Sequence, residues 1–89
     1  MHKIIGVTDL NGRCIKSAIT GRFVIDWFNI ELIEGNIIVL EIKNGIKSEF
    51  YKTSFLHKIN ESENFIEILT ENCIIILEKI FIDLNILDA

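Results

Sequence analysis

Turn-forming residues recur about every ten positions along this chain, and apolar runs rich in isoleucine fill the intervals. The turn residues are Asn11-Gly12, Gly21, Glu34-Gly35-Asn36, Asn44-Gly45, the polar stretch 60–64 and Glu71-Asn72, and the sequence contains no proline. Short strands laid side by side by tight connections produce this spacing. The sequence therefore predicts an all-β fold, either a small barrel or an antiparallel meander of six to eight short strands.

The composition predicts one domain with more apolar material than it can enclose. A chain of 89 residues has material for one core, here residues 1–89, and buries only about 60–65% of its unfolded surface. Hydrophobic residues nevertheless make up 49% of the chain. No run approaches the 18 uninterrupted apolar residues of a membrane helix, and the start lacks the features of a secretory signal. We therefore expect a cytoplasmic homo-oligomer that does not enter a membrane.

Alternation of side chains assigns faces to the first strands. Ile5 and Val7 would share one face of a strand that Asn11-Gly12 joins, as a hairpin, to a second strand over residues 14–19. Residues 22–33 carry apolar side chains on both faces, interrupted at Asp26. A strand of that kind is either central in the sheet or part of an interface.

The middle of the chain predicts a second hairpin. Ile38, Leu40 and Ile42 form an inner set, and Asn44-Gly45 would supply the two residues with positive φ that a type I′ turn requires before the chain returns over residues 46–50. Strands over residues 55–59, 65–70 and 73–79 would complete the meander.

The C-terminal tail keeps strict two-residue alternation almost to its end. Its apolar set, the predicted oligomer interface, is Ile80, Ile82, Leu84 and Ile86. Two interpretations compete: the tail closes its own barrel, or it adds as a strand to a neighbouring subunit. A helix from Leu77 onward is a third, disfavoured by the β-branched residues that precede it.

The reactive side chains predict no enzyme, no metal and no cofactor. The chain has no metal-binding spacing among its cysteines and histidines, which are Cys14, Cys73, His2 and His57. We expect both cysteines to be buried reduced thiols. Ser54 and His57 would point to opposite faces of a strand, so they make a poor nucleophile and base. The chain also has no glycine-rich phosphate loop.

One cluster combines cations with aromatic rings and predicts a ligand site. Its members are Lys43, Lys47, Tyr51, Lys52, Phe55, His57 and Lys58. Small barrels hold single-stranded nucleic acid by stacking and charge in this way. Lysines that protect a sheet edge and aromatic rings in the core would give the same pattern. The net charge of −4 disfavours broad phosphate-backbone binding.

The first two thirds of the chain resembles the Sm-like family. Residues 10–13, the Ile19-Thr20-Gly21 turn and residues 26–32 are similar to the first signature of that family, and residues 51–59 to a degraded second signature. The resemblance covers roughly residues 5–59 and implies a small SH3-like or Sm-like barrel that forms rings and binds RNA, with Asp26, Asn29 and Lys52 in the site. Lys52-Thr53 replaces the family's arginine-glycine pair, and about thirty further residues follow.

Two classes of function therefore follow from the sequence. The first is a non-catalytic binding and assembly module that acts through oligomerisation and a protein partner, such as an inhibitor or immunity protein of a phage or mobile element. The second is an oligomeric barrel that binds single-stranded RNA or sequesters a small nucleotide.

Overall fold

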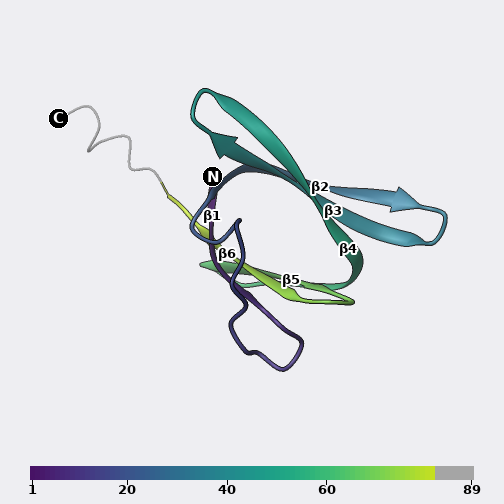
Figure 1. The fold of residues 1–89 in the computed structure, drawn as a ribbon. Coiled ribbons are helices and arrows are strands. Elements are labelled where there is room, and N and C mark those ends of the chain that lie inside the picture. Colours follow the sequence, from purple (N-terminus) through teal and green to yellow (C-terminus); the bar gives the residue numbers. More distant parts are fainter. Residues whose placement is uncertain (82–89) are drawn as a thin grey trace.

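The computed structural model describes residues 1–81 of the chain as a closed six-stranded barrel (Figure 1). The strands are β1 (His2–Thr8), β2 (Phe23–Leu32), β3 (Gly35–Asn44), β4 (Lys47–Glu61), β5 (Phe65–Thr70) and β6 (Ile74–Lys79). Each strand is antiparallel to the next, and β6 pairs with β1 to close the sheet. The prediction of an all-β small barrel is confirmed. Within residues 1–81 no helix has the length and apolar character needed to cross a membrane.

The core consists of side chains that point into the barrel from β1, β2, β3, β5 and β6, together with Ile19 of the loop between β1 and β2, and Leu56 and Ile59 of β4 pack against it. The buried set is Ile4, Val7, Ile19, Val24, Ile38, Leu40, Ile42, Ile66, Ile68, Ile75 and Leu77. The predicted inner set of β3 is confirmed, because Ile38 and Leu40 are fully buried and Ile42 nearly so. Alternate positions of a strand point to the same side of the sheet. The aliphatic residues at alternating positions therefore gather on the inner side and form the core.

The face assignment predicted for β1 is wrong. The pairing of β1 with β6 shifts register between Ile4 and Gly6, which is a β-bulge. One extra residue in a strand reverses the alternation beyond it. Ile4 and Val7 therefore both point into the core, whereas Ile5 is exposed.

The first predicted hairpin is also wrong. Residues 9–22 form a loop, and the only strand-like pairing in it is a single bridge between Thr8 and Cys14. The Asp9 carboxylate organises its first turn, accepting hydrogen bonds from the backbone N–H of Asn11 and of Arg13, both at 2.9 Å. Cys14 is exposed and Cys73 is half-buried, so the prediction of two buried cysteines is corrected as well.

The second predicted hairpin is present, but its turn lies one residue later than predicted. β3 ends at Asn44, which pairs with Lys47, so the turn residues are Gly45 and Ile46. Gly45 has φ of 64°, and no described residue other than glycine has positive φ. A two-residue turn with positive φ only at its first position is of type II′ rather than I′.

β4 is one long, bent strand that belongs to two parts of the barrel wall. Its first half pairs with β3 and its second half with β5, and the register against β3 shifts at Ile38. At that bulge the backbone N–H of Ile38 donates to the Thr53 hydroxyl oxygen at 2.9 Å, and the Thr53 hydroxyl donates to the Ser54 carbonyl at 2.8 Å. A buried threonine thus replaces the backbone partner that the bulge removes.

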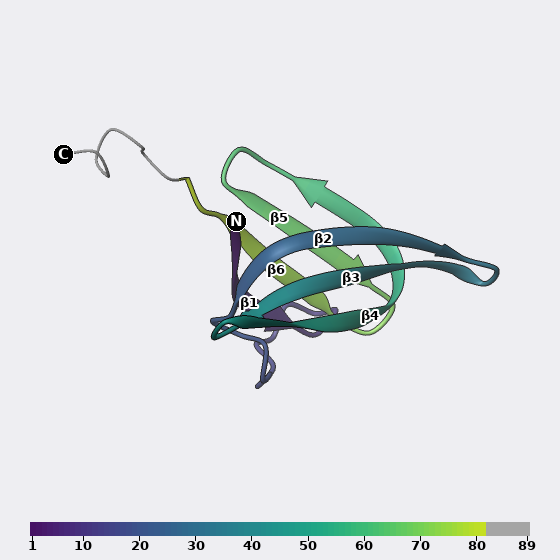
Figure 2. The ribbon, with the colours of Figure 1, turned by 90° about the horizontal axis from the view of Figure 1, so that it is seen from above.

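The far part of the β2–β3 hairpin projects beyond the rest of the barrel (Figures 1 and 2). We call residues 28–39 the arm. The two strands of the arm are joined by the turn residues Ile33 and Glu34, and Ile33 is fully exposed.

The barrel closes before the tail begins. The last described contact of the chain end is the hydrogen bond of 3.0 Å from the backbone N–H of Ile80 to the Met1 carbonyl. The other three residues of the predicted tail interface, Ile82, Leu84 and Ile86, lie outside the described residues. Closure therefore comes from β6 and β1 and needs none of residues 82–89.

Candidate interaction surface

The arm and the adjoining part of β4 present an apolar surface on the outside of the barrel. Directly paired residues of antiparallel strands point to the same side of a sheet. Phe28 pairs with Val39, Ile30 pairs with Ile37, and Ile37 pairs in turn with Phe55. These side chains point away from the core because their neighbours Ile38 and Leu40 point into it. We call the surface the outer face; its members are Phe28, Ile30, Leu32, Ile37, Val39 and Phe55.

The outer face is open to solvent along β2. The exposed fractions of Phe28, Ile30 and Leu32 are 39%, 40% and 48%. The opposite side of the arm is polar towards its tip, where Asn29 and Glu31 are exposed, whereas at its base Ile38 joins the core. The tip of the hairpin therefore has apolar side chains on its outer side and polar side chains on its inner side. A strand that only covers the core of its own subunit has the opposite arrangement. A contiguous exposed apolar surface of this kind is typical of an interaction site.

A β-bulge near the start of β2 creates this reversal. The register between β2 and β3 shifts between Val24 and Asp26. Val24 is fully buried, and Trp27 packs against the core three positions later. Without the extra residue, Phe28 and Ile30 would continue the inward set of Val24. The bulge instead turns them outward.

Gly35 allows the ring of Phe55 to complete the outer face. A Cβ atom on Gly35 would lie 3.2 Å from Cδ1 of Phe55, closer than an ordinary van der Waals contact. Gly35 also has φ of 148°, which side chains rarely adopt. Glycine at this position therefore lets β4 approach the arm closely.

One edge of the arm has no neighbouring strand among the described residues. β2 pairs with β1 only at Phe23 and Val24, so residues 25–32 have β3 on one side and an open edge on the other. Leu32 and Gly35 flank the two-residue turn and form the last pair of the hairpin. The backbone groups of the even-numbered residues therefore face β3, and those of Asn29 and Glu31 face outward. Consistent with this, the N–H of Trp27 donates to its neighbour Asp26 at 2.8 Å.

The structure separates the predicted basic and aromatic cluster. Tyr51 pairs with Leu40 and so lies on the inner side of the sheet, whereas Lys52 pairs with Val39 and lies on the outer side. Phe55 belongs to the outer face. His57 stands at a further bulge of β4 and is exposed, and Lys58 pairs with Leu69 of β5. The cluster thus spans both sides of β4.

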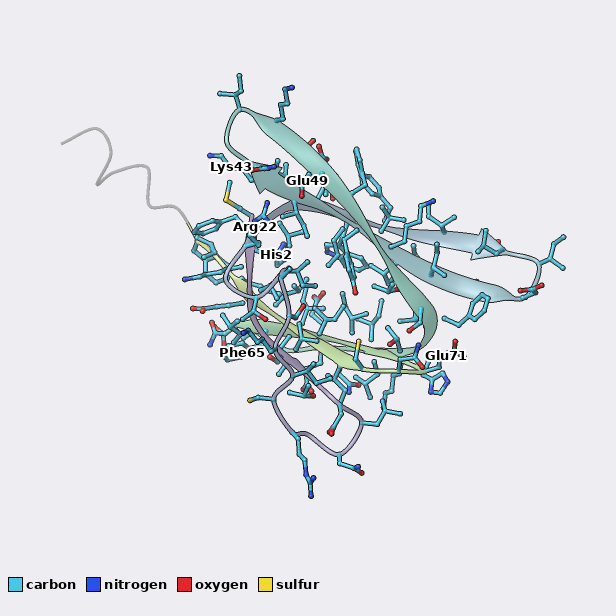
Figure 3. All side chains as sticks on the ribbon, viewed as in Figure 1. His2, Arg22, Lys43, Glu49, Phe65 and Glu71 are labelled. Atoms are coloured by element: carbon cyan, nitrogen blue, oxygen red, sulfur yellow. The ribbon has the colours of Figure 1, made fainter. Side chains whose placement is uncertain are left out.

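The two remaining lysines of the cluster lie at the β3–β4 turn. Lys43 pairs with Ser48, and Lys47 pairs with Asn44. Figure 3 shows Lys43 beside Arg22 and Glu49. Arg22 Nη2 donates to the Lys43 carbonyl at 3.2 Å and lies 3.8 Å from the Glu49 carboxylate, so Arg22 ties this turn to the start of β2.

The three residues that the Sm-like resemblance implied for an RNA site do not share one face. Asp26 pairs with Glu41 and points outward, as does Lys52. Asn29 pairs with the fully buried Ile38 and therefore lies on the opposite side.

His2 is a partly enclosed titratable group at the end of the barrel. Its ring Nδ1 is buried and has no hydrogen-bond partner among the described residues. Burial lowers the pKa of His2 below its ordinary value of 6.5, and the positive charges of the N-terminus and Lys79 lower it further, against smaller opposing effects of Glu61 and Asp26. Residues 1–81 bring together no group of three potential metal ligands and enclose no pocket.

Sequence reasoning found the apolar residues of β2 but not their arrangement. The visible signal was Asp26, which interrupts the alternating apolar set where the bulge occurs. The open edge was not predictable, because it depends on how few residues of β1 pair with β2. Comparisons with protein-family models, curated proteins and solved structures gave no match to this chain.

Proposed function

We propose that this protein is a non-catalytic binding and assembly module that acts through self-association and contact with a protein partner. The observation that carries the proposal is the outer face, an apolar surface built on a projecting hairpin whose other side is polar towards its tip. Burial of apolar area drives most protein association, at about 25 cal/mol per Å². Phe28, Ile30 and Leu32 are partly exposed, so burying them against another chain would favour association.

The sequence supports more specific proposals for the form of the assembly and for its biological role. A ring like that of Sm-like proteins is one form that the assembly can take, and an inhibitor or immunity protein of a phage or mobile element is one role for such a module. The expectation of a cytoplasmic protein stands beside them. RNA or nucleotide binding has less support, because the basic and aromatic cluster is divided between two sides of β4.

Sedimentation of the full chain over a wide concentration range tests the proposal. We expect species heavier than the 10.3 kDa monomer. Ile30→Glu should shift the population towards the monomer, because it places a charge in the outer face. Ile46→Glu is the matched control: Ile46 is also exposed, in the β3–β4 turn, and this change should leave the mass unchanged.

Two results would contradict the proposal. One is a chain that stays monomeric at every concentration and retains no protein partner through the outer face. The other is self-association that Ile30→Glu and Ile46→Glu weaken equally. Stabilisation of the chain by single-stranded RNA, lost in Lys52→Ala, would favour the alternative function instead.

A further inference from the structure

The open edge of β2 has the properties of a site for an added strand. Outward-facing backbone groups at Asn29 and Glu31 offer donors and acceptors to a neighbouring chain. The edge contains no proline, and neither of these two residues is a lysine, so it lacks two common protections against pairing. Peptide segments bind such edges through main-chain hydrogen bonds and gain specificity from alternate side chains.

The chain itself contains a segment suited to this edge. Residues 82–86 follow the described part, and the open edge covers residues 25–32. At about 3.3 Å per residue, these five tail residues span roughly 17 Å as a strand, so the edge is long enough to accept them. Ile82, Leu84 and Ile86 alternate with the polar Asp83 and Asn85. This pattern would match a strand that is apolar on one side and polar on the other.

The sides of the two strands also correspond. When a strand is added to an edge, its side chains continue the two faces of the sheet. The apolar set of the tail would lie beside Phe28, Ile30 and Leu32, and the polar set beside Asn29 and Glu31. Apolar pairs across strands contribute about 0.2–1 kcal/mol each relative to alanine pairs, and shield one another from water.

The position of the chain end favours a strand from a second copy. The barrel is complete at Lys79, so the tail is not needed for closure of its own subunit. Residues 80 and 81 leave the barrel on the side away from the arm in both views (Figures 1 and 2). To pair with its own β2 edge, the tail would have to turn back from this direction towards the arm.

We propose that residues 82–89 of one copy add as a strand to the open β2 edge of a second copy. The proposal rests on the assembly function proposed above and names its contact. Each subunit donates one tail and accepts one, so two copies related by a two-fold axis, or a closed ring, satisfy every tail and every edge. In this proposal, the strand formed by residues 82–89 is itself the contact that joins the subunits.

Two point variants of the full chain block the two halves of this contact. Leu84→Pro interrupts strand formation in the tail. Asn29→Pro removes the N–H that faces the open edge and leaves the β3 side of the hairpin intact. The matched controls are Leu84→Val, which keeps the tail pattern, and Asn29→Ala, which keeps the N–H. Folding of each variant is checked by circular dichroism, and mass is measured by sedimentation.

We expect the full chain and both controls to assemble, and each proline variant to sediment as a 10.3 kDa monomer. An equimolar mixture of the two proline variants should recover a two-chain species, because one supplies an intact tail and the other an intact edge. Direct pairing of two β2 edges would give a different result: Leu84→Pro would assemble normally.

The outcomes separate this proposal from the assembly function. Assembly of Leu84→Pro equal to that of the full chain overturns strand exchange and leaves self-association standing. A full chain that stays monomeric overturns strand exchange together with the self-association on which it rests, and leaves contact with a protein partner to be tested separately. If Asn29→Pro does not fold, the comparison of Leu84→Pro with Leu84→Val decides alone, because the barrel closes without the tail.

Discussion

The hydrogen bond between the Ile38 N–H and Thr53 allows a quantitative prediction about the bulge in β4. In Thr53→Val the hydroxyl is replaced by a methyl group of similar size, and the amide of the fully buried Ile38 loses its acceptor. An unsatisfied buried donor costs about 1–3 kcal/mol. The added buried methyl returns up to about 0.8 kcal/mol. The difference spans about 0.2–3 kcal/mol, and the middle of this range, about 1–2 kcal/mol, is the expected net loss.

This loss is large for a chain of 89 residues, whose free energy of unfolding should be about 4–13 kcal/mol. At about 4–8 °C per kcal/mol, Tm should fall by about 4–16 °C. Urea unfolding and differential scanning calorimetry measure the two quantities. Hydrogen exchange gives a local test, because the Ile38 amide should exchange faster in the variant.

Thr8→Val is the matched control. Thr8 is 8% exposed and Thr53 is 7% exposed, so the same methyl is buried in each variant. The Thr8 hydroxyl donates to the Asp9 carbonyl, which also accepts from the Gly12 N–H at 3.0 Å and so keeps a partner. We expect Thr8→Val to change stability by less than about 0.8 kcal/mol. Equal stabilities of the two variants would refute the reasoning.

Two further predictions concern single residues at the barrel end and in the arm. Because the pKa of His2 is lowered in the folded chain, the unfolded chain takes up a proton first as pH falls below about 6.5, and stability should decline until pH passes the lower folded pKa. His2→Gln should flatten this part of the profile of unfolding free energy against pH; an unchanged slope would contradict the assignment. Gly35→Ala should cost about 1–3 kcal/mol, since it combines backbone strain with the close approach of Phe55. Gly12→Ala, with positive φ but no atom within 4 Å, should lose less in thermal unfolding, and an equal loss would show that the Phe55 contact is unimportant.

The sequence predicts where the strands of this fold lie better than it predicts which strands pair with each other. β5 has the predicted bounds, and the inner set of β3 is correct, because both follow from local alternation. The Asn11-Gly12 hairpin failed because residues 9–22 form a loop, so the neighbours of β1 are β2 and β6, and β6 lies almost seventy residues later in the chain. No local pattern records such a distant pairing.

Bulges account for most of the remaining errors. An extra residue at Ile5 and another at Ile25 each reverse the faces beyond them. Asp26 interrupts the apolar alternation at the second bulge, but the sequence contains no such sign of the first. Of the candidate site, the apolar character of β2 and the alternating tail were readable. The outward direction of Phe28 and Ile30 required the register with β3.

The pairing of β1 with β6 also has a consequence for biosynthesis. All other neighbours in the barrel are consecutive strands, whereas β1 leaves the ribosome first and its closing partner last. At about 5–20 residues per second, β1 waits about 4–14 s for β6. During that time β2, β3 and β4 can pair, but the nascent barrel stays open and its inward-facing side chains are exposed to water. The order of synthesis therefore leaves the closing edges of β1 and β6 unpaired until translation has passed Lys79.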